Sequence, residues 1–363
     1  MINANFYALT APALTSYLQT KQYSSYVTSQ LLSWVYKHQH LSMEQWMNVS
    51  KKLRAQLCLD FSFELPLIES IQRSIDGTTK FLLRFNDGEG VESVLIPTAN
   101  RLTQCLSTQV GCAMKCAFCF SGSEGPKRNL QAHEIVGQYI AVNRFLLKNP
   151  IIIPEDPLCT YYPKITNLVF MGQGEPLNNY EEVKRATTIF LEPQGIAFGQ
   201  RKVTLSTCGV VPKILLLNEF PPVNLAVSLH SPRDAIRDQL MPINRSYNLE
   251  KLFTALNQLS LKAYRRITYE YLLIDELTNT PEDLELLIKL LIRERSKINL
   301  IPFNEYPGHS FKRPSDEKNL WFCNELGKHG FTATIRQSKG RDILAACGQL
   351  KATRTSVITT SNC

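Results

Sequence analysis

Three cysteines at Cys-x3-Cys-x2-Cys spacing are the residues with the clearest chemical potential in this chain. Cys112, Cys116 and Cys119 stand together in one short segment. A structural zinc site needs four closing ligands, and a fully protein-ligated iron–sulfur cluster usually needs four cysteines. Three close cysteines can instead bind three irons of a [4Fe–4S] cluster and leave the fourth iron open. We therefore predict such a cluster, in preference to three buried thiols spaced by chance.

Two further cysteines stand apart from this triad. Cys105 lies in a predicted strand, and Cys347 lies in a loop-like segment after the last predicted strand, where it is followed by a glycine. Basic side chains near Cys347 favour the thiolate, which is the nucleophilic form; they are Arg336, Lys339 and Arg341. The other cysteines that we assign are predicted to be small core hydrophobes, namely Cys58, Cys159, Cys208 and Cys323.

Small and polar residues follow several of the predicted strands. Parallel sheets bind ligands at the carboxyl ends of their strands. Each residue taken singly is better explained as a strand cap or a turn, but five polar strand ends around one cysteine loop predict a cofactor site. Its candidate residues are Gly174, Glu175, Ser206, Ser228, Leu229, His230 and Asn304. Among them, Glu175 offers a carboxylate that can accept from an ammonium group.

A repeated strand–helix pattern must position these residues. The predicted strands are 104–108, 165–171, 202–207, 224–230, 267–274, 298–303 and 332–337, and the predicted helices are 132–147, 180–191, 248–260, 281–295 and 315–328. This alternation predicts an α/β fold with a parallel sheet and helices outside it. Six or so units are too few for a closed eightfold barrel, so we predict a partial (βα)6 barrel over residues 98–350.

The rest of the chain divides into shorter parts. Residues 1–62 show helical periodicity and predict a small accessory domain that resembles an RNA-binding module, with a capping box at Ser42 and Gln45 that starts a helix running to about Leu57. Residues 63–97 alternate in polarity around Asp-Gly turns and predict a β-meander linker. Residues 351–363 are small and polar and predict a disordered tail.

Composition narrows the class of protein. The 363 residues carry a net charge of +8, which suggests a polyanionic partner, and ten cysteines in a chain of this length do not make a small disulfide scaffold. We see no signal peptide and no apolar run long enough to cross a membrane. We therefore expect a cytoplasmic protein in a reducing compartment that also protects an oxygen-labile cluster.

Taken together, the motifs resemble the RlmN/Cfr family of radical S-adenosylmethionine (SAM) RNA methyltransferases, over nearly the whole chain up to Leu350. The open-iron triad, with the aromatic Phe118 before its third cysteine, is the superfamily's signature. The motifs that carry the resemblance are 91–94, 105–112, 174–176, 206–207, 228–232, 240–244, 299–302 and 345–350. Three departures stand out: Phe120-Ser121-Gly122 after the triad, Cys208 where Ser or Thr is common, and Gln173 where Met is usual.

The resemblance implies a role for each candidate residue. Cys112, Cys116 and Cys119 are implied to be the ligands of the [4Fe–4S] cluster. The seven strand-end residues are implied to contact SAM. Cys347 is implied to carry the methyl group, Cys105 to resolve a covalent RNA intermediate through a transient disulfide, and Glu92 to act as the base.

The resemblance also implies the substrate and partners. They are an adenosine of 23S ribosomal RNA, with the adenosine 3′ of the anticodon of some tRNAs as a further target, and an electron donor such as flavodoxin or ferredoxin. We expect a monomer with no membrane partner. Pro176 favours methylation at carbon 2 of adenine over the Cfr-type reaction at carbon 8. The alternatives left open are that carbon 8 reaction, a radical SAM enzyme with a non-RNA substrate, and a metal-stabilised RNA-binding module without catalysis.

Overall fold

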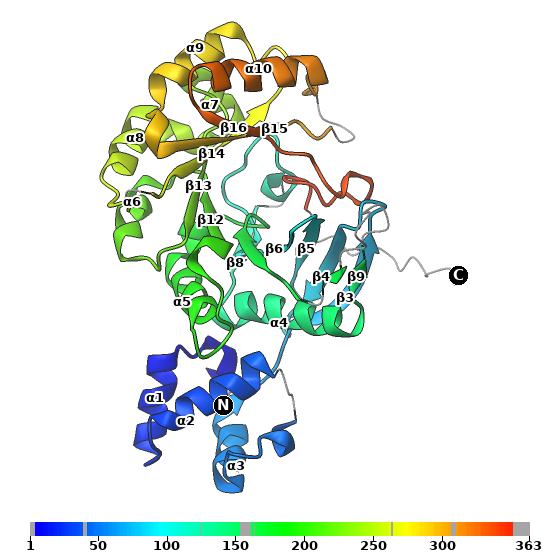
Figure 1. Ribbon diagram of the computed structural model, residues 1–363, viewed down its shortest axis with the longest axis vertical. Coiled ribbons are helices and arrows are strands. Elements are labelled where there is room, and N and C mark those ends of the chain that lie inside the picture. The colour runs from blue at the N-terminus through cyan, green and yellow to red at the C-terminus, as the bar shows by residue number, and fades with distance from the viewer. Residues whose placement is uncertain are drawn as a thin grey trace.

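A ten-stranded mixed sheet forms the centre of the molecule (Figure 1). The computed structural model describes residues 4–38, 42–123, 125–152, 161–162, 164–262, 264–305 and 310–350. The strand order is β16-β15-β14-β13-β12-β11-β6-β5-β4-β3, so the sheet is open and its edges are β16 and β3. The tail and Cys159 lie outside the described residues.

Seven of these strands run parallel and form the predicted α/β core. They are β6 (Arg101–Cys105), β11 (Asn167–Phe170), β12 (Val203–Thr207), β13 (Asn224–Ser228), β14 (Ile267–Leu273), β15 (Ser296–Pro302) and β16 (Thr332–Ile335). The open parallel sheet confirms the predicted fold class. The prediction placed the first strand about three residues late, because Thr98 and Arg101 pair across a tight hairpin and β6 begins directly after that turn.

Helices connect the parallel strands and pack on the outer side of the sheet (Figure 1). They are α4 (Ala132–Lys148), α5 (Tyr180–Leu191), α6 (Val211–Ile214), α7 (Asp234–Leu240), α8 (Leu249–Asn257), α9 (Pro281–Leu290) and α10 (Asp316–Lys328). Helix α9 ends earlier than predicted, because the chain becomes extended at Leu291 and leads through a 3-10 turn at Arg293–Arg295 into β15. Within the described part of the chain, none of the helices is both long and apolar enough to cross a bilayer.

The predicted meander is part of the same sheet. Strands β3 (Leu67–Arg73), β4 (Thr79–Arg84) and β5 (Gly90–Thr98) pair antiparallel with one another, and β5 pairs antiparallel with β6. The meander therefore extends the core sheet and carries Glu92 into it, where we had predicted only a linker.

The N-terminal helices gather at one end of the molecule, with α4 between them and the sheet (Figure 1). They are α1 (Ala11–Thr20), α2 (Tyr26–Leu32) and α3 (Lys51–Asp60). The predicted capping box was wrong, because the side chain of Ser42 caps no helix and only a 3-10 turn follows it. Trp46 is buried against Phe63, and Ser50 caps α3 by accepting from the N–H of Leu53 at 3.2 Å. Cys58 is exposed, so its predicted place in the core was also wrong.

Candidate active site

The three cysteines lie in a loop between two short strands, β7 (Gln109–Gly111) and β8 (Pro126–Asn129). The N–H of Cys112 donates to the carbonyl of Gly125 at 3.1 Å, and that of Cys119 donates to the carbonyl of Cys116 at 3.1 Å. Cys116 and Phe118 pack on an apolar cluster at the carboxyl ends of the parallel strands. The hairpin thus holds the triad over the end of the sheet where ligands bind in parallel folds.

The three thiols lie near one another, with Cys112 buried and Cys116 and Cys119 half-buried. Burial raises the pKa of Cys112 to about 11 and also raises the pKa values of Cys116 and Cys119. Cys112 and Cys119 each raise the pKa of Cys116 further, so these sulfur atoms lie near one another. In the described part of the chain, no three His, Cys, Asp or Glu side chains are gathered closely enough to bind one metal ion. A [4Fe–4S] cluster does not require three ligands around one metal ion, because each of its irons is bound by a separate thiolate.

The triad loop is tied directly to the segment that carries Cys347. The N–H of Phe120 donates to the carbonyl of Gly348 at 2.7 Å, and the hydroxyl of Ser121 donates to the carbonyl of Leu350 at 2.7 Å. Gly348 has φ +81°, and an added Cβ would lie 3.1 Å from the carbonyl oxygen of Phe118. Phe120 and Ser121, which depart from the usual family pattern, therefore join the cysteine loop to the C-terminal loop.

Glu175 is buried at the carboxyl end of β11. Its carboxylate accepts from the backbone N–H of Leu177 at 3.0 Å and from that of Cys208 at 2.8 Å. Burial raises the pKa of Glu175, while these N–H donors favour the charged form. Gly174 has φ +95°, and an added Cβ would lie 2.5 Å from that of Gln109. Both residues are thus fixed in place. The contact of Glu175 with an ammonium group and that of Gly174 with SAM stay predictions.

His230 follows β13 and is neutral. Its Nδ1 accepts from the N–H of Leu272 at 3.1 Å, so the proton of the neutral ring is on Nε2. Burial lowers the pKa of His230 to about 3, with a further contribution from Arg237. The ring meets Phe118 of the triad loop edge-on at 4.8 Å. The structure therefore brings this predicted strand-end residue against the cysteine loop.

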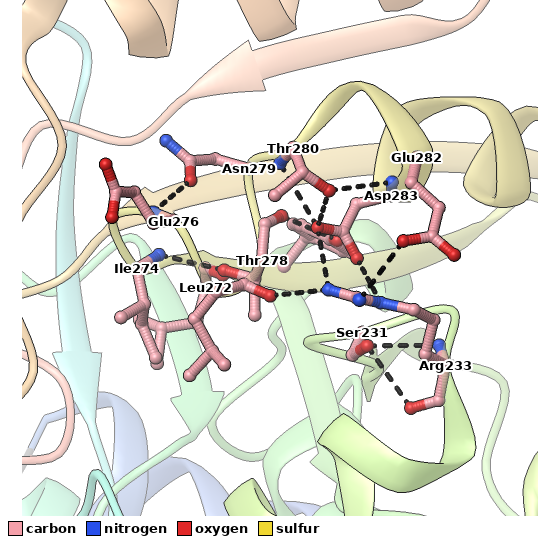
Figure 2. Close-up of polar contacts among 12 residues, drawn as sticks. Ser231, Arg233, Leu272, Ile274, Glu276, Thr278, Asn279, Thr280, Glu282 and Asp283 are labelled. Carbon is pink, nitrogen blue, oxygen red and sulfur yellow. Dashed lines mark hydrogen bonds and ion pairs between the residues drawn. The ribbon is translucent and has the colours of Figure 1, made fainter.

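An ion-pair network fixes the loops that follow β13 and β14 (Figure 2). Arg233 donates from Nε to Asp283 Oδ1 at 2.9 Å and from Nη2 to Asp283 Oδ2 at 3.1 Å. Nη2 also donates to the carbonyl of Leu277 at 2.8 Å. Asp283 completes a capping box with Thr280 at the start of α9. A bidentate pair of this kind is among the stronger side-chain contacts, and it holds the turn beside His230.

Asn304 is a predicted site residue whose side chain is incompletely satisfied. It is 5% exposed, and its Oδ1 has no hydrogen-bond partner within the described residues. An unpaired buried acceptor costs about 1–3 kcal/mol, so a ligand that donates a hydrogen bond there is favoured. Ser206 and Ser228 are half-buried at the ends of β12 and β13, and Leu229 is buried. These residues fit a polar cofactor, and their individual contacts stay predictions.

Cys105 and Cys347 are neighbours in the structure. Cys105 is buried at the end of β6 in an apolar cluster with Ala345 and Leu350. Burial raises the pKa of Cys105 to about 12, and Cys347 raises it further while Arg336 lowers it. Cys347 raises the pKa of Arg336, so the guanidinium lies near this thiol. The fold thus brings two thiols from opposite ends of the core together beside one guanidinium.

Glu92, the predicted base, is also buried, two residues before Val94, which stands opposite Cys105 in the sheet. Its Oε1 lies 3.1 Å from Nζ of Lys80 on the neighbouring strand. Its own N–H donates to Oε1 of Gln173 at 2.8 Å. The hydroxyl of Ser107, which follows β6, donates to its carbonyl at 2.7 Å. The structure therefore places the side chain of Glu92 in a fixed, largely dry position.

Comparison with known proteins finds relatives over nearly the whole chain. The radical SAM superfamily matches residues 106–291, and the ribosomal RNA large subunit methyltransferase N-terminal domain matches residues 4–61. The dual-specificity RNA methyltransferase RlmN of Syntrophus aciditrophicus is 41% identical over 350 residues, which cover 96% of this chain and 97% of that protein. The protein of the same name from Bdellovibrio bacteriovorus is 40% identical over 346 residues, which cover 95% of this chain and 83% of that protein.

The chain belongs to the RlmN family of the radical SAM superfamily. The resemblance seen in the motifs is thereby confirmed. A crystal structure of a radical SAM methyltransferase from Sphaerobacter thermophilus agrees with a TM-score of 0.85 and 37% identity, covering 96% of this chain and 100% of that one. Membership of the superfamily implies a [4Fe–4S] cluster and SAM as cofactors, and the three neighbouring thiols and the polar strand ends fit those groups.

Arg237 is a site residue of this RlmN-family chain that sequence reasoning missed. It is fully buried on α7 and donates to the carbonyls of Leu229, Cys208 and Ser228 and to the side chain of Asn244. It therefore joins the ends of β12 and β13 beneath the triad loop. A signal was available, because Arg237 lies one helical turn before the 240–244 motif, but a single arginine on a helix is usually solvated.

Replacing Arg237 with Met should lower the free energy of unfolding by about 3 kcal/mol, because several buried acceptors lose their charged donor. Urea denaturation of the two proteins measures the difference. The exposed Arg245 is the matched control, and Arg245→Met should leave stability within about 0.5 kcal/mol of the parent. Equal losses in the two variants would contradict the role given to Arg237.

Proposed function

We propose that this RlmN-family chain methylates carbon 2 of an adenosine in 23S ribosomal RNA, and of an adenosine in tRNA. The observation that carries the proposal is the meeting of Cys105, Cys347 and Arg336 beside the cysteine triad. Generic radical chemistry needs neither of the two extra thiols. A methyl transfer that runs through a cysteine-bound intermediate needs both.

The proposed cofactors would be held by different parts of the site. Cys112, Cys116 and Cys119 would bind the cluster, and the polar strand ends would contact SAM. When bound, these groups supply the methyl group and the radical chemistry that adenine carbon 2 requires. The protein supplies position and exclusion of water, which its buried loops and fixed strand ends provide.

The residues of the chain would then act in sequence. Cys347 carries the methyl group on its sulfur. The radical that the cofactors would supply would remove one hydrogen atom from that methyl group, so that its carbon could bond to the ring carbon, and the cofactors would take up the electron left on the ring. Glu92 takes the proton from the ring carbon onto a carboxylate oxygen. The Cys105 thiolate attacks the sulfur of Cys347, so that a disulfide forms and the sulfur–carbon bond breaks. The electron pair of that bond stays with the released carbon, which gains a proton and becomes the methyl group of the product.

RNA as the substrate is supported by charge and by the relatives. The net charge is +8, and Arg128 and Lys127 lie on β8 next to the triad loop. Arg128 is paired with Glu134 and Asp87, so it is not a free phosphate contact. The names of the relatives state RNA methyltransferase activity for those proteins. A base must leave its stack to reach such a site.

Mass spectrometry of RNA nucleosides after anaerobic turnover tests the proposal. We expect 2-methyladenosine from 23S ribosomal RNA that lacks the modification, and from tRNA. Appearance of 8-methyladenosine would instead support the Cfr-type reaction. Absence of both products, from a preparation that contains iron and sulfide and cleaves SAM, would contradict an RNA substrate.

A further inference from the structure

Lys80 is a charged residue that the proposed function leaves without a role. In the β4–β5 ladder it stands opposite Val94, and Val94 stands opposite Cys105 in the β5–β6 ladder. Side chains of directly opposed residues lie on the same face of a sheet. Glu92 is two positions from Val94 on β5 and therefore shares that face. Lys80, Glu92 and the thiol of Cys105 thus project toward one side of the sheet.

The ion pair between Lys80 and Glu92 is largely buried. Nζ of Lys80 lies 3.1 Å from Oε1 of Glu92, and the two side chains are only 12% and 8% exposed. Charges attract more strongly in such a setting than in water. Removal of Lys80 takes a compensating charge away from the buried carboxylate, which is unfavourable. The ionised state of Glu92 therefore depends on Lys80.

Lys80 also contacts the loop that carries Cys347. Its Nζ donates to the carbonyl of Leu344 at 3.4 Å. The same loop is fixed to the β3–β4 turn, because Asp342 accepts from the hydroxyl of Ser74 at 2.6 Å and Asp76 accepts from the N–H of Gly340 at 2.8 Å. One ammonium group thus joins the predicted base to the loop of the predicted methyl carrier.

Within the described residues, three elements contribute the charged or titratable groups that contact Glu92 or interact with Cys105. Lys80 projects from β4 and Cys105 from β6. Arg336 and Cys347 come from the C-terminal loop, where they interact with each other and with Cys105. Within the described residues, the structure gives an ion pair of this carboxylate with Lys80. Arg336 instead lies near Cys347 and lowers the pKa of Cys105.

We propose that Lys80 is a positioning residue that keeps Glu92 ionised and directed toward the base to be methylated. This inference rests on the proposed function. Glu92 accepts a proton from the ring carbon only as a carboxylate, and the electron pair of the broken carbon–hydrogen bond stays in the ring. Lys80 neither gives nor takes that proton. Lys80 preserves the negative charge of the Glu92 carboxylate, which takes the proton.

The test uses full-length, cluster-loaded enzyme in which Lys80 is replaced by Met. We expect the acidic limb of the pH–turnover profile to move upward by about 1 to 3 pH units, because an opposite charge at this distance has an effect of that size on a carboxyl group. At neutral pH the covalent protein–RNA adduct should accumulate on gels. Methylation of Cys347, read by intact-protein mass spectrometry, should be unchanged because it needs no base. Lys80→Arg should restore the normal profile.

A double variant separates action through Glu92 from a general effect on folding. If Lys80 acts through Glu92, then Glu92→Gln with Lys80→Met should turn over no more slowly than Glu92→Gln alone. Any loss of thermal stability in Lys80→Met should also be recovered in the double variant, because the buried charge is gone. Lys318→Met is the control, since it removes a lysine from a half-exposed ion pair with Asp275.

Two results would overturn the inference. One is a Lys80→Met profile that superimposes on that of the parent. The other is a loss of stability or activity that the double variant deepens, which would give Lys80 a structural role of its own. Both differ from failure of the proposed function, in which the parent protein itself yields no methylated adenosine.

Discussion

Replacing Cys105 with Ala is expected to trap the RNA on the enzyme as a covalent adduct, with methylation of Cys347 intact. Cys105 lies in a buried apolar cluster near Cys347, which fits the proposed attack of its thiol on the sulfur of Cys347. Without that attack, the sulfur–carbon bond to the RNA has no route to cleavage. Denaturing gels of the enzyme with labelled RNA should show a shifted band, and product release should fall to background.

Two variants control this experiment. Cys347→Ala should abolish both methyl loading and the adduct, because it removes the carrier itself. Cys323→Ala changes a cysteine on α10, away from the thiol pair, and should behave as the parent does. Normal turnover by Cys105→Ala would contradict its resolving role.

The pKa of Cys105 sets the expected pH dependence of adduct release. Burial raises that pKa to about 12. Only the thiolate attacks a sulfur, and its population below the pKa grows tenfold with each pH unit. Adduct release in single-turnover reactions should therefore accelerate as pH rises from neutral. Arg336 lowers the pKa of Cys105, so Arg336→Met should slow release at a given pH.

Replacing Cys116 with Ala is expected to remove the iron–sulfur cluster and all methylation with it. Cys116 lies near Cys112 and Cys119. Each of the three thiolates is expected to bind one iron, so the cluster should not survive the loss of one of them. Iron and acid-labile sulfide after anaerobic reconstitution should fall to background, and the visible absorption of the cluster should be lost. Methylation of Cys347 and of RNA should both stop.

The exposed Cys58 supplies the matched control for this second experiment. It lies on α3 in the N-terminal domain, where its Sγ contacts the sulfur of Met43 at 3.4 Å. Cys58→Ala should retain full iron, sulfide and activity. Retention of the cluster in Cys116→Ala, or its loss in Cys58→Ala, would contradict the assignment of the triad.

Local sequence patterns predicted much of the fold. Tyr180–Leu191 forms the predicted helix with both ends correct, because its apolar residues recur at helical spacing. The error at Ser42 has a tertiary cause. Burial of Trp46 against Phe63 outweighed a local capping signal, and the helix starts only after Ser50.

The sequence alone determined the kinds of chemistry available to this protein. The spacing of Cys112, Cys116 and Cys119 indicates one open iron, because ligand count is a local property. The strand–helix alternation also determined that the polar residues following the parallel strands meet at one end of the sheet. Cys105 and Cys347 are recognisable in the sequence as unusual thiols.

Only the tertiary structure decided which of these residues are partners. It placed Cys347 beside Cys105, fixed the C-terminal loop to the triad through Ser121, and paired Glu92 with Lys80. Arg237 acquired its role in the same way, because its acceptors lie on strands that only the fold brings together. Such contacts depend on strand register and loop closure between distant segments, which no local pattern encodes.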